Sequence, residues 1–384
     1  MQCLIAFLCC FVLLACKDNV PLKTNLLIAT SNGDMYNIDL VKNQLLWRIA
    51  GNKNTDELTF FTLRGNTILR AYSDKRVIEI DRDTGKVNWT YDDAISPNHS
   101  AYGYDFKGVS HYLFNQYPIV QDKALVFGNS MGEVKSIDLK TRAINWTHQA
   151  AQPIYSSPIL VDGKLLVNEN SYLEFVDPAN GRKLTRLAFD RPLTQQPVLD
   201  GQAVYVIDED GTVFCLSTDL GLIWKFKAES VRSIQAVGVS DVYVSGEKLQ
   251  ALDKKTGELR WAISMPKQQT KQSVETTKDN SVYVVQAKSD AVQGVQEVDG
   301  ELTVNTAHYL VKLKAKNGSV VRQHYFATRE IIGTSTQYKG QHYYLASDGA
   351  VYTMDSNFEK ESVVSKAIAY QTERKLDDSY MVLY

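Results

Sequence analysis

The segment that comes nearest to catalytic machinery is Gly128-Asn129-Ser130-Met131-Gly132, which matches the G-x-S-x-G pattern of a nucleophile elbow. Such an elbow needs a strand before the serine and a helix after it, so that the hydroxyl is exposed at a sharp turn. Here residues 124–127 (ALVF) and 133–138 (EVKSID) both read as strands. The motif therefore predicts a hairpin turn, and nucleophilic catalysis is the lesser alternative.

Candidates for metal or phosphate chemistry are weaker still. Asp208-Glu209-Asp210-Gly211 begins like a calcium loop, but the ligands further along such a loop, including its terminal glutamate, are missing. It lies between two apolar runs, which favours a hairpin turn. No histidines have metal-site spacing, and there is neither a P-loop nor a G-x-G-x-x-G segment. The histidines are His99, His111, His148, His308, His324 and His342. We therefore expect no metal and no cofactor.

Composition describes an ordinary globular protein. The chain has 384 residues, of which 44% are hydrophobic and 22% charged, and its formal net charge is -2. This charge provides no basic field for nucleic acid. Outside the first 16 residues the single cysteine is Cys215, so no intramolecular disulfide is expected there. Cys215 lies in an alternating segment, TVFCLS, and is predicted to be a small core residue.

The N-terminal residues are different in character. Residues 4–15 (LIAFLCCFVLLA) are continuously apolar, too short for a membrane-spanning helix but suited to the apolar region of a secretory signal. The sequence Leu13-Leu14-Ala15-Cys16 resembles the lipobox of bacterial lipoproteins, which implies cleavage before Cys16 and its acylation. An ordinary signal peptide is the alternative. By the same resemblance Lys17, in place of an aspartate, implies the outer membrane.

The rest of the chain is a repeat. Residues 81–89 (DRDTGKVNW) and 253–261 (DKKTGELRW) share the pattern D-x-x-T-G-x-x-x-W, and related segments recur at intervals of roughly 40 residues. The eight segments span residues 36–47, 78–89, 135–146, 174–185, 214–224, 250–261, 311–322 and 352–363. All five tryptophans occupy the same place in this unit: Trp47, Trp89, Trp146, Trp224 and Trp261. We interpret them as structural residues that start the fourth strand and fill the wedge between neighbouring sheets.

The units share a pattern of short strand-like runs, four in all but the first, separated by turn residues. Asp-Gly, a strong hairpin signal, recurs in these turns at 162–163, 200–201, 210–211 and 348–349. A sheet of this size covers its faces only if its neighbours pack against it in a ring. The sequence therefore predicts an all-β protein, an eight-bladed β-propeller of four-stranded antiparallel blades. The first unit has three strands, and we expect residues 379–384 (SYMVLY) to complete it. The expected organisation is a signal peptide at 1–16, a tether at 17–24 and the propeller at 25–384.

The repeat resembles the PQQ-type β-propeller unit, and a lipoprotein signal followed by eight such units resembles the BamB family of the outer-membrane β-barrel assembly machine. That resemblance implies a non-enzymatic, lipid-anchored scaffold on the periplasmic face of the outer membrane. Its implied partners are a BamA-like barrel assembly protein and other subunits of the machine, bound through loops between blades. One alternative is another PQQ-repeat lipoprotein with a different protein partner or a small ligand in the central channel. The other is a quinoprotein dehydrogenase, but the adjacent cysteines of those enzymes have their single match here in Cys9-Cys10, within the signal.

Two intervals between units exceed the period, and insertions there are candidate functional loops. Residues 93–115 carry five aromatic residues, expected to bind a partner or to form a local lid. They are Tyr102, Tyr104, Phe106, Tyr112 and Phe114. In the second insertion, residues 288–307, the segment VDGE is expected to be a hairpin tip that extends its blade or a solvated protrusion.

Replacing Cys16 by serine tests the predicted anchor. Serine removes the thiol that would be acylated, so the variant is expected to move from the membrane fraction to the soluble fraction. Immunoblots of fractionated cells measure this, with Cys215→Ser as a control that keeps the anchor. A Cys16→Ser protein that still sediments with membranes contradicts the prediction.

Overall fold

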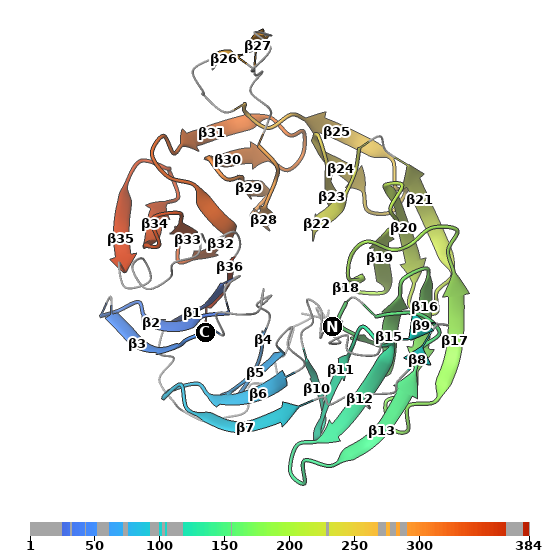
Figure 1. Ribbon diagram of the computed structural model, residues 1–384. Helices are drawn as coiled ribbons and strands as arrows, with labels where there is room; N and C mark the ends of the chain where they lie inside the picture. The colour runs from blue at the N-terminus through green and yellow to red at the C-terminus, as the bar shows by residue number, and fades with distance from the viewer. Residues whose placement is uncertain are drawn as a thin grey trace, which may run out of the picture.

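The computed structural model describes residues 25–383, apart from 31–32, 43, 52–60, 72–75, 93–99, 102–103, 106–117, 155, 228–229, 268–273, 277–281, 285–289 and 366–378. Its strands form eight four-stranded antiparallel sheets, which Figure 1 shows arranged as blades around a ring. The described residues contain no helix, and hence none that could cross a membrane. The predicted eight-bladed propeller is confirmed.

The blades are numbered in chain order, and their strands are given from the innermost to the outermost. Blade one consists of β36 (Ser379–Leu383), β1 (Asn25–Thr30), β2 (Met35–Asp39) and β3 (Gln44–Ile49), and blade two of β4 (Phe61–Arg64), β5 (Thr67–Ala71), β6 (Arg76–Asp81) and β7 (Val87–Asp92). Blade three consists of β10 (Ile119–Gln121), β11 (Ala124–Gly128), β12 (Glu133–Asp138) and β13 (Ile144–Gln149). Blade four consists of β14 (Ile159–Val161), β15 (Lys164–Glu169), β16 (Tyr172–Val176) and β17 (Lys183–Ala188).

Blades five to eight follow the same plan. Blade five consists of β18 (Val198–Asp200), β19 (Ala203–Ile207), β20 (Thr212–Ser217) and β21 (Leu222–Lys227), and blade six of β22 (Ser233–Val237), β23 (Asp241–Ser245), β24 (Leu249–Asp253) and β25 (Leu259–Ile263). Blade seven consists of β28 (Gly294–Val298), β29 (Glu301–Asn305), β30 (Tyr309–Lys314) and β31 (Val320–Tyr325). Blade eight consists of β32 (Ile331–Tyr338), β33 (Gln341–Ala346), β34 (Val351–Asp355) and β35 (Glu361–Ser365). Two small hairpins stand apart, β8 (Ser100–Ala101) with β9 (Tyr104–Asp105) and β26 (Val274–Thr276) with β27 (Val282–Val284).

The ring is closed by the last strand of the chain. β36 pairs with β1 in antiparallel register, for example Leu26 with Leu383 and Ala29 with Tyr380. All six residues of β1 are buried, because the strand has a neighbour on each edge and a blade against each face. The predicted completion of the first blade by the C-terminal segment is confirmed, and β1 has a partner strand on both edges.

The repeated aspartate explains the turn between the third and fourth strands of a blade. Asp81 accepts hydrogen bonds from the backbone and side chain of Thr84 at 2.8 and 2.7 Å. Asp138 accepts them in the same way from Thr141. These bonds hold the pKa of both carboxyl groups below the ordinary value for aspartate. The D-x-x-T pattern is therefore the signature of a side-chain-capped turn.

The tryptophans join each blade to the next. The indole Nε1 donates to the backbone carbonyl that follows the repeated aspartate position in the next blade, from Trp47 to Arg82 at 2.7 Å and from Trp224 to Lys254 at 3.0 Å. The ring then lies on the turn glycine of that blade: a Cβ added to Gly257, which has φ +74, would lie 2.6 Å from the Trp224 ring. Trp146 and Trp261 make the same contacts. These four rings lie between neighbouring blades, and each lies just inside its strand, after a β-bulge, and not at the start of the strand.

Trp89 is an exception, because the turn that receives its ring has no glycine. The corresponding turn of blade three has Arg142 at the left-handed position, with φ 63. Its guanidinium lies 4.6 Å from the centre of the Trp89 ring and forms an ion pair with Glu79 at 2.8 Å. A cation–π contact therefore takes the place of the ring-on-glycine contact at this junction.

The excess residues of blade seven lie upstream of the predicted 288–307 insertion. Asp299-Gly300 is a hairpin tip, as expected, but it joins β28 to β29, which are the two inner strands of the blade itself. The additional chain runs from β25 to β28 and includes β26 and β27, which Figure 1 shows outside the ring. The hairpin does not extend the blade, because the segments on either side of its tip are the regular strands β28 and β29.

Two glycines separate the cost of the tryptophan contact from the cost of the backbone conformation. Gly163→Ala places a Cβ in open space at φ +76, so it should lose about 1–2 kcal/mol through left-handed strain alone. Gly257→Ala has the same strain and also displaces the Trp224 ring, so we expect a further loss of roughly 1–3 kcal/mol. Denaturant midpoints measured by tryptophan fluorescence compare the two. Equal midpoints would show that the ring does not rest on the glycine.

Candidate functional site

The junction between blades four and five lacks the usual tryptophan and holds a groove of about 610 Å³. In blade four the equivalent position is Thr185, which pairs with Phe175 as Trp146 pairs with Ser136 in blade three. The groove is lined by Leu187, Ala188, Phe189, Asp190, Arg191, Asp208, Asp210, Thr212, Phe214, Leu216, Leu220, Leu222, Lys225 and Lys227. The signal in the sequence for this junction is the missing tryptophan of the fourth unit, which the seventh and eighth units lack as well.

Neighbouring side chains replace part of the missing ring. Phe175 and Leu220 are both buried in the core between these two blades. Leu220 occupies the turn before β21 with φ 72, the left-handed conformation that a glycine adopts in most other turns of this kind. It carries its side chain into the junction, where it is 6% exposed. The inner part of the junction is therefore packed, and the outer part remains open.

Strand register decides which residues form the groove walls. Thr212, Phe214 and Leu216 of β20 lie opposite Lys227, Lys225 and Leu222 of β21. Directly opposite residues of an antiparallel pair point to the same face, and Phe214 and Leu216 pack toward blade four. This wall is consequently extended outward by Leu222 and by the aliphatic parts of the Lys225 and Lys227 side chains. From blade four the opposite wall is formed by Leu187, which shares a face with Leu173.

The loop at the end of the groove is held by both blades. Phe189 donates its backbone N–H to Ser171 of blade four at 2.9 Å, and its ring packs edge-on against Phe214 of blade five at 5.2 Å. Backbone bonds also join Leu193 to Asn170. The groove therefore has a preformed end, so binding there costs little ordering of this loop.

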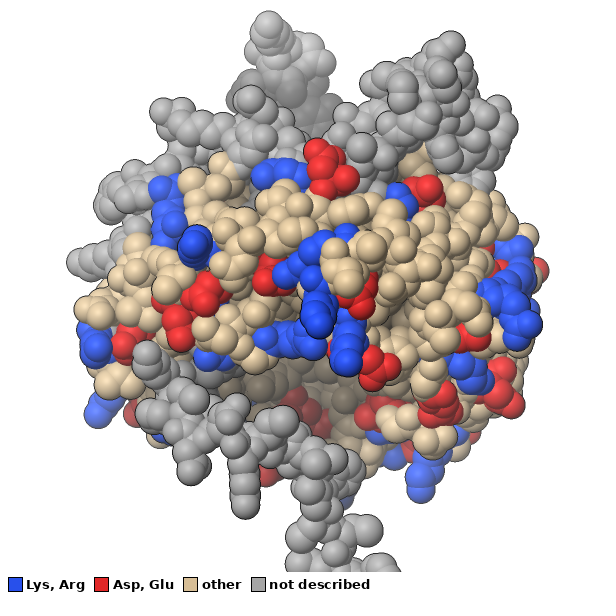
Figure 2. All heavy atoms as spheres, turned by 90° about the horizontal axis from the view of Figure 1, so that it is seen from below, with Lys and Arg blue, Asp and Glu red and all other residues tan. Residues whose placement is uncertain are grey.

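The charges of the groove are mixed. Arg191 lies 3.3 Å from Asp210 and 3.8 Å from Glu209, and all three side chains are close to half exposed, so these ion pairs add little stability. Lys225 and Lys227 supply positive charge to the other wall. Figure 2 likewise shows basic and acidic residues intermixed on another face of the molecule. An apolar floor with both signs of charge suits a polypeptide segment better than a polyanion.

A free strand edge borders the groove on each side. β17 pairs with β16 and β21 pairs with β20, and neither has a second partner among the described strands. Each carries a bulge near its beginning, after which its ladder continues to Ala188 or Lys227. Beside them Leu222 and Ile223 are 58% and 52% exposed. The arrangement can receive an extended peptide both through side-chain contacts and through backbone pairing.

The structure places the sequence candidates as follows. Asn129 caps a hairpin turn between β11 and β12 through its Oδ1, which accepts from the N–H groups of Met131 and Glu133, so Ser130 is not on an elbow before a helix. Residues 208–211 form the turn between β19 and β20. Cys215 is buried in β20, and burial raises the pKa of its thiol.

The remaining site candidates lie at or beyond the limits of the described residues. Tyr104 belongs to β9, but its side chain is not described. The other candidates outside the described residues are Cys16, Tyr102, Phe106, Tyr112 and Phe114. Lipidation and partner binding by these residues therefore stay predictions.

Comparison with known sequences gives a consistent family. The family model described as "Outer membrane protein assembly factor BamB" matches residues 20–217 and, in a second overlapping match, 169–330. The outer membrane protein assembly factor BamB of Alkalilimnicola ehrlichii is 21% identical over 210 residues. That match covers 51% of this chain and 50% of the relative, so the chain spans half the length of the curated relative.

Solved structures share the fold at low sequence identity. BamB from Moraxella catarrhalis superimposes with a TM-score of 0.55 at 13% identity, covering 80% of this chain and 88% of that one. The computationally designed Ika8 protein gives 0.62 at 15% identity, with 86% and 93% covered. Quinohemoprotein alcohol dehydrogenase from Comamonas testosteroni gives 0.58 at 12% identity, with 92% and 75% covered. At these identities the likeness concerns the propeller alone.

Leu220 allows a direct test of how the groove junction is packed. Leu220→Ala loses about 2–5 kcal/mol of buried packing and retains the left-handed strain of a non-glycine residue. Leu220→Gly removes the same packing but relieves that strain, so it should be more stable than Leu220→Ala by roughly 1 kcal/mol. Urea unfolding measures both. At Leu216, buried on an ordinary strand, the order should reverse, and the same order at both positions would contradict this account.

Proposed function

Because the chain belongs to the family of outer membrane protein assembly factor BamB, we propose that it is a non-enzymatic scaffold that assists the insertion of β-barrel proteins into the outer membrane. In this proposal it binds a BamA-like assembly protein and brings it together with other subunits of the machine. Family membership supports the class of function. The groove between blades four and five supports the proposal that a partner binds at this junction.

The observation that carries the proposal is the groove bordered by two free strand edges. Proteins that handle unfinished β-barrels meet extended, alternating apolar segments with unpaired backbone groups. A groove with an aliphatic floor and an available β-edge matches both features of such a segment. The groove's preformed end would orient the segment before its strands pair.

We further propose that Cys16 is acylated and that residues 17–24 tether the propeller to the periplasmic face of the outer membrane. Eight residues reach at most about 27 Å when fully extended. Such a tether would keep the groove close to the membrane surface. Anchoring by two or more acyl chains would hold the protein there firmly, whereas one chain binds weakly.

A non-enzymatic role is also what the described chemistry supports. The serine of the G-x-S-x-G segment is on a hairpin, and Cys215 is the single cysteine of the described residues, so these residues do not supply the adjacent-cysteine pair of quinoprotein dehydrogenases. The structural likeness to a quinohemoprotein alcohol dehydrogenase, at 12% sequence identity, concerns the fold.

Site-specific photocrosslinking in the native membrane tests the groove. A photoreactive residue at Leu222, in the groove, is compared with one at Val320, which occupies the equivalent outer-strand position of blade seven and is similarly exposed at 49%. We expect the Leu222 probe to capture a barrel-assembly protein several-fold more efficiently. Leu222→Asp should reduce co-purification of that protein, and Val320→Asp should not.

Equal capture from both positions would contradict groove binding while leaving the scaffold function intact. Recovery of many membrane proteins but never a barrel-assembly protein, from any position on the ring, would contradict the scaffold function itself.

A further inference from the structure

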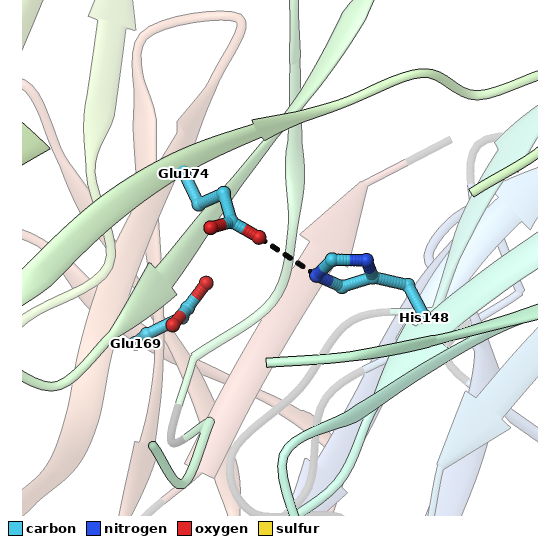
Figure 3. Close-up of side chains that lie close together, drawn as sticks. All are labelled: His148, Glu169 and Glu174. Atoms are coloured by element: carbon cyan, nitrogen blue, oxygen red, sulfur yellow. Dashed lines mark ion pairs between the residues drawn. The ribbon is translucent and has the colours of Figure 1, made fainter. Parts of the chain in front are cut away.

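The opposite face of blade four holds a buried cluster of ionisable groups that the proposed function does not use. His148 comes from β13 of blade three, Glu169 from the end of β15 and Glu174 from the middle of β16. Glu169 is 0% exposed, and the other two are also buried. Figure 3 shows both carboxylates and the imidazole pointing toward one another. One ligand-type atom from each lies within 4.8 Å of the other two.

Hydrogen bonding fixes the orientation of the histidine. Its Nδ1 lies 3.0 Å from the backbone carbonyl of Gly181, which accepts and never donates, so Nδ1 carries the proton. Nε2 is thereby directed at Glu174, 2.8 Å from Oε1. A bare lone pair so close to a carboxylate oxygen is repulsive, so Nε2 requires a proton or a metal ion between the two atoms. Histidines that bind metals are commonly held by this kind of bond from the other ring nitrogen.

Glu169 contributes an oxygen that no described donor satisfies. Its Oε2 accepts from Arg186 at 2.7 Å and from the backbone N–H of Ala151 at 3.0 Å. Its Oε1 is fully buried and has no hydrogen-bond partner among the described atoms. A buried acceptor of this kind costs stability unless something binds it. The carboxyl group is held in place by Arg186 and the backbone, so Oε1 is preorganised for a ligand.

Two basic residues balance the carboxylates. Arg186 contacts Glu169, and Lys183 contacts Glu174 Oε2 at 2.5 Å. The Lys183 side chain is 49% exposed, so its ammonium group can move into solvent. A divalent ion carries two positive charges, so it would replace the single charge of the Lys183 ammonium group and the single charge of the proton on His148 Nε2. The cluster therefore accepts such an ion without an unbalanced buried charge.

The two glutamates differ in acidity because their surroundings differ. Burial, followed by the charge of Glu174, raises the pKa of Glu169. Burial also opposes ionisation of Glu174, but hydrogen bonds from His148 and Lys183 outweigh it and lower the pKa of Glu174.

From this geometry we infer that His148 Nε2, Glu169 Oε1 and Glu174 Oε1 form a binding site for one divalent transition-metal ion of the Zn²⁺ class. Tetrahedral ligands about 2.0–2.1 Å from Zn²⁺ lie roughly 3.4 Å from one another, a separation these atoms reach with small side-chain movements. One imidazole and two carboxylates suit Zn²⁺ or Co²⁺ better than Ca²⁺, which prefers six to eight oxygen ligands. The ion would join blade three to blade four. The site does not depend on the proposed scaffold function.

Titration of the purified protein with Co²⁺ tests the site, because a low-symmetry Co²⁺ site with an imidazole ligand gives visible absorption. We expect absorption that saturates at one equivalent and is lost when Zn²⁺ is added, together with a rise of a few degrees in the unfolding midpoint at saturating Zn²⁺. His148→Gln and, separately, Glu169→Gln should weaken Co²⁺ binding at least tenfold. Lys183→Met should bind several-fold more tightly, because it removes the competing ammonium group.

His342→Gln serves as the matched control, because His342 is a buried histidine of blade eight outside this cluster. Circular dichroism checks that each variant is folded. Absence of a saturable Co²⁺ signal in the unmodified protein would overturn the inference whatever the variants do. So would equal affinity of the unmodified protein and a folded His148→Gln variant, or weaker binding by Lys183→Met.

Discussion

The propeller depends on one repeated contact, the indole ring of one blade against the turn of the next. The contact requires two things of the receiving turn: a residue that tolerates positive φ and a surface with no Cβ in the way of the ring. Glycine meets both requirements, which is why Thr-Gly and Trp occur together along the chain. Gly85, Gly181, Gly257 and Gly318 all lie against a tryptophan of the preceding blade. Each indole also satisfies a backbone carbonyl of the turn it covers, so the junction is both packed and hydrogen-bonded.

Where one partner of this contact is missing, another residue takes over its role. At the junction of blades seven and eight, Arg322 stands at the tryptophan position and donates to the carbonyl of Asn357 at 2.6 Å. Phe358 of that turn has φ 57 and brings its ring into the core. At the junction of blades four and five, Thr185 is too small to fill the space of an indole ring, and Leu220 fills only the inner part. The outer part of that junction is the groove.

The sequence was sufficient for the architecture because the repeat is a property of local patterns. Tryptophan spacing and Asp-Gly turns predict eight sheets, and the three-stranded first unit predicts closure by a distant strand. The sites could not be predicted in the same way. His148, Glu169 and Glu174 come from three strands in two blades, so their separation along the chain has no metal-site pattern. The groove arises from an absent side chain at Thr185, which a search for motifs does not detect. Both features lie on blade four, one on each face, and neither corresponds to a repeated residue of the unit.

The pairing of β36 with β1 has a consequence for the order in which the molecule can be completed. A ribosome releases β1 at the beginning of synthesis and β36 at the end, so the seam of the ring is the contact with the greatest separation along the chain. Until that seam forms, the inner edge of blade one remains an unpaired template for other strands. A nascent chain of this kind therefore remains an open arc until β36 pairs with β1, and during that time the inner edge of β1 is available for pairing with other strands.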